Sequence, residues 1–374
     1  MVAPVPITMV SANVGPTQPL PANGHIELGF DRLLQPTSIT RQTFVLTNAA
    51  GNIPYTPTIA YDPVARIVTM TPLSDPNQKL VSGQSYEVVI QAPQNAGDMN
   101  GLRAIDGATL RHSPQSIAFS VIDPTPAPPV VRIDFCRDIF PITSVKCSLP
   151  MCHGGAEPAA GLLLDPPRGI PQTAVGRVAQ GSNTGPRAVA SPPTLLFGED
   201  MPIIDATGNT NGNPGNSWLL YKLLLSMPSP EPVNAPANEA GTGEAGGEDG
   251  GSDATVGAPD SGAIEAGATD GGAPADGGSP ADAGATEAGA GEGGVPTPVV
   301  VPPADVSGVH SPLTWEGIPL AERATLSNYI LGREMPFPPT PVMLNPTNNP
   351  LTLQEMERMS LWIAQGASAP ASCP

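Results

Sequence analysis

The sequence predicts a multidomain protein in which an all-β sandwich is followed by a small, mostly helical domain that a disordered acidic insert interrupts. Three observations lead to this prediction. Short β-branched runs separated by turn residues fill the first third of the chain, helix-type apolar spacing is confined to the rest, and one stretch is of low complexity. The 374 residues suffice for two domains, and the 49 prolines and 41 glycines exclude a largely helical chain. We expect the sandwich at 1–123, a proline-rich linker at 124–131, the helical domain at 132–230 and 295–374, and the insert at 231–294.

The first 123 residues hold six strand-like runs with turn clusters between them. Short strands at this spacing indicate a sandwich rather than a parallel sheet with crossover helices. The expected strands are Ile7–Val14, His25–Phe30, Thr43–Asn48, Ile67–Thr71, Tyr86–Gln91 and Ile117–Val121.

The phrase Gly29-Phe-Asp-Arg-Leu-Leu34, with Thr43-Phe-Val-Leu46 and Tyr86-Glu-Val-Val-Ile90 after it, resembles the bacterial Ig-like domain of surface-layer proteins. The resemblance covers nearly the whole segment and implies a spacer or display module without an active site. Asp31 and Asp106 are the acidic residues of its turns, and we expect them to hold those turns rather than to bind calcium.

Beyond the linker the pattern changes to short helices and long loops. The segment from Ala237 to Gly294 carries twelve of the 34 acidic residues and neither Lys nor Arg, and it is too poor in apolar residues to offset the entropy of ordering. We expect three helices around it: Trp218–Leu225 capped by Asn216-Ser217, Leu320–Leu331, and a last helix from Thr352 to Gly366. Thr352-Leu-Gln-Glu355 has the spacing of a capping box.

The run Cys147-Ser-Leu-Pro-Met-Cys152-His153 is the chemically informative motif of the chain. A cysteine pair that ends in Cys-His is typical of covalent haem attachment, in which two thioethers hold the porphyrin and the histidine ligates iron. The usual spacing leaves two residues between the cysteines, and here there are four. Residues five apart do not share one helical face, so the intervening residues must leave the helix. Pro150 permits this because it disfavours a helical Leu149.

The sixth ligand of such a haem is commonly a methionine on a loop, and three Met-Pro pairs occur, at Met201, Met227 and Met335. Met335 is favoured because its loop directly precedes the last helix, with Met201, Met227 and His310 as alternatives. The alternative interpretation is that Met335 only fills a gap in the packing and is not a ligand.

The second half also resembles the cytochrome c-like domains of exported multidomain proteins in myxobacteria and planctomycetes. The matching phrases are Cys152-His-Gly-Gly155, Gly161-Leu-Leu-Leu164, Met335-Pro336 and Trp362-Ile-Ala-Gln-Gly-Ala367. The resemblance implies one covalent haem c, with Cys147 and Cys152 as thioether attachments and His153 and Met335 as axial ligands. It also implies Leu162, Leu164 and Trp362 as walls of the haem pocket.

Four cysteines allow three disulfide pairings. With haem attached, Cys136 and Cys373 remain to tie the first and last helices together. Without haem, Cys147 and Cys152 could also pair, and both pictures use all four thiols. A zinc site or a redox-active dithiol is a third alternative, although His25, His112 and His310 lie in unrelated contexts.

The function we expect is therefore an exported electron carrier whose haem domain is displayed by an Ig-like spacer, with a redox partner in the cell envelope. The alternative is a haem-free, disulfide-stapled surface or interaction protein. No catalytic motif is present, and an acidic chain without a basic stripe argues against nucleic-acid binding. No segment is apolar enough to span a membrane. Met1-Val-Ala-Pro4 is no signal peptide, so we expect the sequence to start downstream of one, with the protein in the periplasm or at the cell surface.

Overall fold

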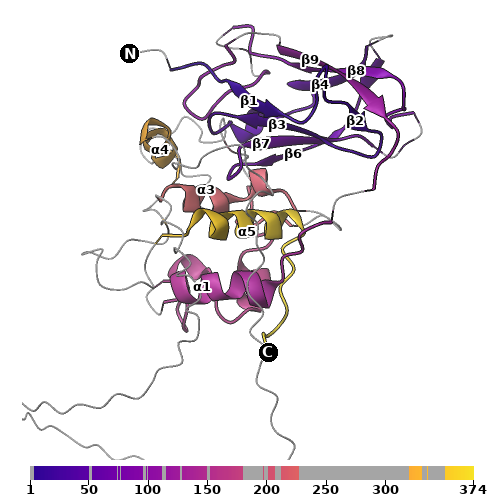
Figure 1. Cartoon of the computed structure of the whole chain (residues 1–374). Helices are drawn as coiled ribbons and strands as arrows, with labels where there is room; N and C mark the ends of the chain where they lie inside the picture. The colour runs from indigo at the N-terminus through magenta and orange to yellow at the C-terminus, as the bar shows by residue number, and fades with distance from the viewer. Residues whose placement is uncertain are drawn as a thin grey trace, which may run out of the picture. The chain divides into compact units, whose positions relative to one another are not determined.

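The structure is a computed structural model in which two β-sheets share one core and a group of short helices follows them (Figure 1). The structure describes residues 4–49, 53–73, 75, 77–95, 98, 100–111, 115–126, 129–149, 152–179, 197, 201–206, 212–226, 320–330, 335 and 350–374. The predicted insert at 231–294, Met227, His310 and Pro150 lie outside these residues.

The first sheet is antiparallel and has the strand order β1-β3-β7-β6. Its strands are β1 (Met9–Ala12), β3 (Ile26–Phe30), β7 (Ile67–Thr71) and β6 (Thr58–Asp62). The second sheet has the order β2-β9-β8-β4-β5, and only its β2–β9 pair is parallel. Its strands are β2 (Leu20–Pro21), β9 (Gln115–Ile122), β8 (Ser85–Ile90), β4 (Phe44–Asn48) and β5 (Ile53–Tyr55).

Side chains that alternate along the strands form the core between the sheets. In β9, Ile117, Phe119 and Val121 are buried while their neighbours are not, which is the period of two that a strand imposes. Phe30 of one sheet meets Phe44 of the other edge to face, with ring centroids 6.2 Å apart. The predicted β-rich domain is thus confirmed.

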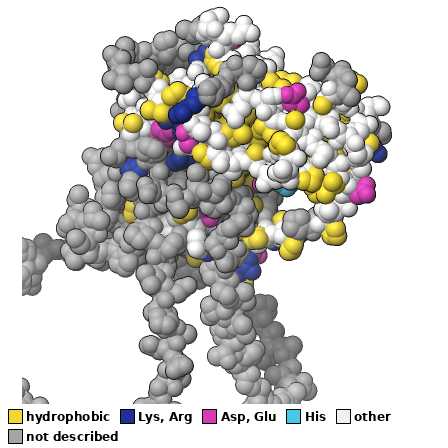
Figure 2. Space-filling model, turned by 45° about the horizontal axis from the view of Figure 1, so that its top comes forward, with side chains coloured by type: hydrophobic (Ala, Val, Ile, Leu, Met, Phe, Trp, Pro, Cys, Tyr) yellow, Lys and Arg dark blue, Asp and Glu magenta, His cyan; other side chains and the backbone are white. Residues whose placement is uncertain are grey.

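On the face in Figure 2, charged side chains are sparse among uncharged ones.

Each predicted strand has a counterpart in the structure, whereas β2, β5 and β6 were not predicted. Proline explains two of the omissions, because Pro54 lies inside β5, and Pro57 and Pro63 flank β6. Proline cannot donate to a ladder and is confined to edge strands, and β5 and β6 are both edges of their sheets. The third, β2, is two residues long.

The helical part begins with a π-helical turn, η2 (Phe135–Ile139), which runs into α1 (Phe140–Lys146). Its other long elements are α3 (Trp218–Leu224), α4 (Leu320–Ser327) and α5 (Leu353–Ala364). Short turns connect them: η3 (Ala159–Gly161), α2 (Gly169–Thr173) and η6 (Pro214–Asn216); a further one, η1 (Pro36–Ser38), lies in the sandwich.

The last helix starts and stops as predicted. The Thr352 hydroxyl accepts the Glu355 N–H at 3.2 Å, and the Glu355 carboxylate accepts the Thr352 N–H at 2.7 Å, which completes the capping box. Gly366 ends the helix with φ of 94°, a left-handed conformation that glycine adopts without strain. Lys146 at the end of α1 reaches the same Glu355 carboxylate at 2.5 Å, which links the first helix to the last.

Removing the cap hydroxyl with Thr352→Ala is expected to lower the free energy of unfolding by about 1 kcal/mol, because the Glu355 N–H loses its acceptor. Urea unfolding followed by circular dichroism measures the change. Thr352→Ser is the matched control, and it should keep most of the stability. Equal losses in the two variants would show that the methyl group, not the cap, is responsible.

Two helix predictions need correction. Ser217 precedes α3 but does not cap it, because its hydroxyl donates to the Asn213 carbonyl at 2.9 Å and accepts the Asp205 N–H at 2.9 Å. The α4 helix ends at Ser327 rather than Leu331. Thr325 and Ser327 lie in its last turn and Asn328 follows it, and the two hydroxyls donate to carbonyls within the helix, which weakens it locally.

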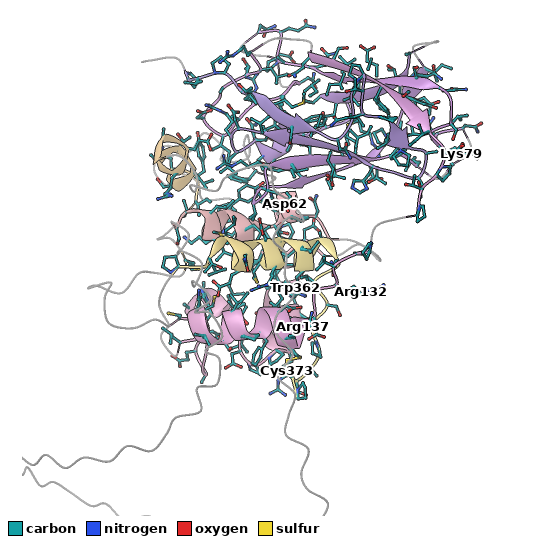
Figure 3. All side chains as sticks on the ribbon, in the orientation of Figure 1. Asp62, Lys79, Arg132, Arg137, Trp362 and Cys373 are labelled. Atoms are coloured by element: carbon teal, nitrogen blue, oxygen red, sulfur yellow. A yellow bond between two sulfur atoms is a disulfide. The ribbon has the colours of Figure 1, made fainter. Side chains whose placement is uncertain are left out.

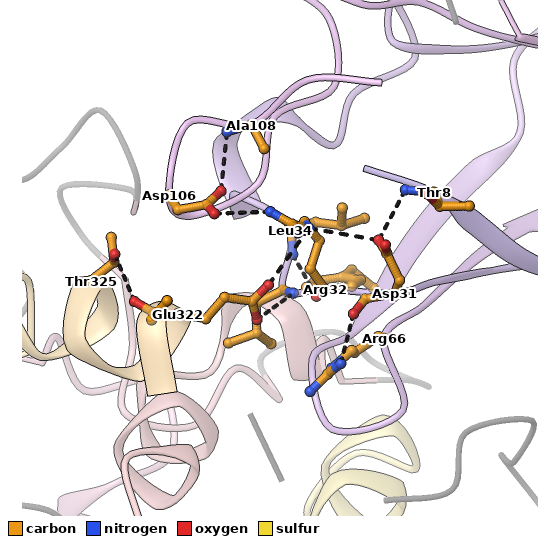
Figure 4. Close-up of polar contacts among 12 residues, drawn as sticks. Thr8, Asp31, Arg32, Leu34, Arg66, Asp106, Ala108, Glu322 and Thr325 are labelled. Carbon is orange, nitrogen blue, oxygen red and sulfur yellow. Dashed lines mark hydrogen bonds and ion pairs between the residues drawn. The ribbon is translucent and has the colours of Figure 1, made fainter. Parts of the chain in front are cut away.

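The helical core also takes in side chains from the sandwich. Leu33, Val64 and Ile105, all at most 2% exposed, belong to the same apolar cluster as the helices. A polar cluster adjoins them, in which Glu322 of α4 accepts the N–H of Leu33 at 3.2 Å and faces Arg32 (Figure 4). The sandwich and the helices are therefore joined by buried contacts as well as by the chain.

Candidate functional site

The Cys-His motif lies at the end of α1, where the chain leaves the helix. The Cys147 N–H donates to the Thr143 carbonyl at 3.0 Å, which is the last helical bond of α1. The His153 N–H then returns to the Cys147 carbonyl at 3.1 Å, and the Cys152 N–H donates to the Leu149 carbonyl at 2.8 Å. The expectation that the wide spacing must break the helix is confirmed, and the resulting closed loop brings His153 back to Cys147.

Gly154 allows this loop to close. A Cβ atom at this position would lie 2.1 Å from the Ser148 carbonyl oxygen, far inside van der Waals contact. The backbone of Gly154 therefore lies against Ser148 in a way that no other residue type permits. The glycine after the Cys-His pair is a geometric requirement of the loop.

His153 is buried, with 5% of its surface exposed, and its ring is held by a backbone carbonyl. The Nδ1 atom lies 3.2 Å from the Leu162 carbonyl oxygen. A carbonyl only accepts, so Nδ1 carries the proton and Nε2 keeps a free lone pair. Burial lowers the pKa of His153, although the carbonyls of Leu162 and Ala159 partly offset it, so the ring is neutral at pH 7.

Met335 faces that lone pair. Its Sδ atom lies 3.4 Å from His153 Nε2, and its own carbonyl accepts the Ser226 hydroxyl of the α3 end at 3.1 Å. With the proton on Nδ1, neither Nε2 nor Sδ has a hydrogen to donate. The two lone-pair atoms thus lie in direct contact with each other.

The two cysteines of the motif are free thiols and half-buried. Burial raises the pKa of Cys147 to about 12, so this thiol stays protonated at neutral pH. Thiolate is the form that reacts in dithiol exchange, so burial disfavours this reaction at Cys147 at neutral pH. The Cys147–Cys152 disulfide that the haem-free alternative allowed is not formed in the structure.

The three residues predicted as apolar walls are buried in the helical core. Leu162 and Leu164 are 8% and 3% exposed, and the Leu164 N–H donates to the His153 carbonyl at 2.9 Å. Trp362 of α5, labelled in Figure 3, is 2% exposed. Its ring lies against that of Phe135, with centroids 5.6 Å apart. The structure thus ties Leu162 and Leu164 directly to His153, and it places Trp362 in the same core.

The structure also places the other residues that the sequence singled out. Met201 is 2% exposed and buried in the core, where its carbonyl accepts the Ala179 N–H at 2.9 Å, while Met335 is the methionine that contacts His153. The predicted Cys136–Cys373 disulfide is confirmed, with Cα atoms 5.4 Å apart. Asp106 accepts the Ala108 N–H at 3.1 Å, two residues further along the chain, which is the turn role expected for it. Asp31 instead accepts the N–H of Thr8 at 2.9 Å, 23 residues away, so this bond joins two distant segments of the sandwich.

Sequence reasoning missed three contributors to the site. The Leu162 carbonyl orients His153, and Ser226 holds the Met335 backbone, but neither contact has a sequence signal. Lys222 lies one helical turn before Ser226 and is only 6% exposed, and its charge adds to the lowering of the His153 pKa. A lysine inside the apolar run of α3 was the available signal.

Among the described residues there is neither a larger metal-ligand cluster nor a membrane-spanning helix. In the described ranges, no group of three or more His, Cys, Asp or Glu side chains is placed to hold a metal ion. The helices within those ranges are all too short or too polar to cross a membrane.

No protein-family model matches the chain, and no curated protein matches it. Similar solved structures include three of the surface layer protein SbsC, each with a TM-score of 0.24. Domains 1–6 are 18% identical over 33% of this chain and 14% of that one, and the N-terminal part of the protein is 18% identical over 33% and 25%. The rSbsC(31-844) structure is 16% identical over 36% of this chain and 16% of that one. The chain thus spans at most a quarter of the length of these proteins.

Proposed function

We propose that this chain is an exported electron carrier with one covalently attached haem c. The observation that carries the proposal is the facing pair of His153 Nε2 and Met335 Sδ, 3.4 Å apart, with Nδ1 committed to the Leu162 carbonyl. The donor set fits the group: two thiols, a neutral imidazole and a thioether belong to one small region. The redox partner would be a protein of the cell envelope.

Each residue has a definite role in this proposal. Cys147 and Cys152 would hold the porphyrin edge, and His153 and Met335 would be the protein ligands of the iron. When bound, the haem would take up and release one electron. The Leu162 carbonyl fixes the His153 ring so that Nε2 would be the ligating atom, and the hydrogen bond from Nδ1 to this carbonyl makes the imidazole a better electron donor. Leu162 and Leu164 exclude water, which is one way in which a protein sets a haem potential.

An exported location is part of the proposal. The Cys136–Cys373 bridge needs an oxidising compartment, and covalent haem attachment in bacteria takes place outside the cytoplasm. We place the protein in the periplasm or at the cell surface on these grounds.

The test is expression in a host with haem-attachment machinery, followed by an absorption spectrum. We expect a reduced α-band at the c-type position that survives acid–acetone extraction, with the intact mass raised by one haem. The double variant Cys147→Ser/Cys152→Ser should lose the covalent haem, and Met335→Ala should keep it but change the sixth ligand. Colourless wild-type protein of unshifted mass would reject the proposal.

The second candidate is a haem-free, disulfide-stapled surface or interaction protein. The direct contact between His153 and Met335 favours it, because the two side chains already touch each other. The helical core is also closed by the Cys136–Cys373 bridge independently of the motif cysteines. The same absorption spectrum separates the two candidates.

A further inference from the structure

His153 and Met335 bring together two neutral acceptor atoms with no hydrogen between them. His153 Nε2 lies 3.4 Å from Met335 Sδ, and His153 Nδ1 lies 3.2 Å from the Leu162 carbonyl oxygen, which only accepts. Because the ring proton is on Nδ1, a lone pair of Nε2 faces a lone pair of the sulfur. Buried acceptors are normally paired with a donor. A single electron-pair acceptor, such as a metal ion, would satisfy both atoms at once.

The distance between the two atoms is that of neighbouring ligands on one small ion. Zinc, a typical first-row ion, holds imidazole nitrogen at about 2.0 Å and sulfur at about 2.3 Å. At the tetrahedral angle these lengths put the two donors about 3.5 Å apart, and on opposite sides of the ion about 4.3 Å apart. The observed 3.4 Å matches the first arrangement. The two side chains could therefore hold one ion with little displacement of Met335.

Both donors are held in place before any ion binds. The His153 ring is 5% exposed, and its hydrogen bond to the Leu162 carbonyl orients Nε2 and raises its basicity. The Met335 carbonyl accepts the Ser226 hydroxyl at 3.1 Å. Met335 is only partly buried, so an ion can reach the pair from the side of the methionine.

The charge around the pair favours a soft ion of low charge. Imidazole and thioether are both neutral, and the charge of Lys222, which is 6% exposed, bears on His153. A buried divalent ion needs anionic ligands to offset its charge. In the part of the chain that the structure describes, no three His, Cys, Asp or Glu side chains converge to supply them. Thioether sulfur is a soft ligand that selects Cu(I), and imidazole also suits copper.

We propose that the haem-free protein binds one Cu(I) ion through His153 Nε2 and Met335 Sδ. This site does not rest on the proposed function, and the two are mutually exclusive in one molecule because haem iron and Cu(I) would use the same two side chains. A haem-free surface protein, the second candidate function, would then carry copper.

The test uses the full chain with Cys147→Ser/Cys152→Ser as the parent protein. These substitutions remove the two free thiols, which would bind Cu(I) by themselves, and they prevent covalent haem attachment. Cu(I) is added without oxygen and with ascorbate, in competition with the coloured chelator bathocuproine disulfonate. We expect one tightly bound Cu(I) per chain.

Two ligand variants and one control define the site. Met335→Leu keeps the volume of the side chain without the sulfur, and His153→Gln removes the imidazole. Each should weaken Cu(I) binding by at least the about 10- to 100-fold that the loss of an outer-shell partner costs. Met9→Leu, the same exchange at a partly buried methionine of the sandwich, should bind like the parent.

Methyl NMR identifies the sulfur that binds. Cu(I) has a closed shell, so spectra of protein labelled with ¹³C-methyl methionine stay sharp. The Met335 resonance is the peak that Met335→Leu removes, and the Met9 resonance is the peak that Met9→Leu removes. Cu(I) should shift the first and leave the second unchanged. Because the ion binds the folded state, it should also raise the urea midpoint of the parent and not that of Met335→Leu.

The outcomes separate this site from the proposed function. A parent protein that does not bind Cu(I), or binding that Met335→Leu leaves unchanged, overturns the site. Zn(II) that competes with Cu(I) on equal terms overturns the choice of ion. If His153→Gln does not fold, Met335→Leu and the Met335 resonance still decide. Colourless wild-type protein from a host with haem-attachment machinery rejects the proposed function alone, because the copper experiment uses a protein that cannot attach haem.

Discussion

Alanine in place of Trp362 is expected to lower the free energy of unfolding by about 3–5 kcal/mol, the range for truncating a buried aromatic side chain. Trp362 is 2% exposed, packs on Phe135 at 5.6 Å and donates its indole N–H to the Ser368 carbonyl at 3.0 Å. The substitution removes the ring contact between α5 and η2 and leaves the Ser368 carbonyl without its indole donor. Denaturant unfolding of haem-free protein measures the loss.

Trp362→Phe is the matched control for this prediction. It retains an aromatic ring against Phe135 and loses only the bond to Ser368 and part of the volume, so it should cost clearly less than alanine. A loss below about 1 kcal/mol for Trp362→Ala would contradict the packing role of this residue.

Opening the long-range disulfide with Cys136→Ser/Cys373→Ser is expected to cost about 2–5 kcal/mol. The bridge joins residues 237 positions apart, so its removal frees a large loop in the unfolded chain and unties the C-terminal segment from η2. The measurement is urea unfolding of the oxidised wild type against the double variant. Peptide mapping of the wild type under non-reducing conditions checks that the bridge is present.

Cys147→Ser/Cys152→Ser in haem-free protein serves as the control for the disulfide, because these two cysteines are free thiols. It changes the same number of sulfur atoms without opening a loop. Equal unfolding midpoints for all three proteins would mean that the Cys136–Cys373 bridge contributes nothing to stability.

Three of the strands that the sequence predicts, β4, β8 and β9, alternate in burial along their length. Residues of β8 and β9 carry their own periodicity, so a local pattern was enough to find them. The edge strands β5 and β6 were missed because Pro54, Pro57 and Pro63 interrupt the pattern, although an edge tolerates proline. The end of α4 was misjudged because the apolar Leu326 and Ile330 continue a helical spacing that the polar residues between them do not sustain.

For the candidate site, the residues were predictable and their arrangement was not. The Cys-His motif identified His153, and the Met-Pro pair before the last helix identified Met335. The orientation of His153 depends on a backbone carbonyl nine residues away, and that of Met335 on a hydroxyl 109 residues away. Backbone acceptors have no residue type, and contacts this far apart leave no periodic pattern. The burial of Glu322 against Leu33, over 289 residues, was invisible for the same reason.

The order in which the chain is made also matters, because the pieces that close the helical core all follow the insert. After α3 ends at Leu224, the 150 remaining residues include α4, α5 and Cys373. At ribosomal rates of about 5–20 residues per second, roughly 8–30 s pass before the last of them exists. During that time Leu33, Val64 and Ile105 lack their partners in α4 and α5, so the nascent chain presents an apolar surface. At equilibrium the length of the insert has little effect on the free energy of folding, because doubling the length of a loop costs only about 0.6 kcal/mol. A longer insert would thus hardly change the stability of the folded protein, but it would lengthen the time for which that apolar surface stays exposed.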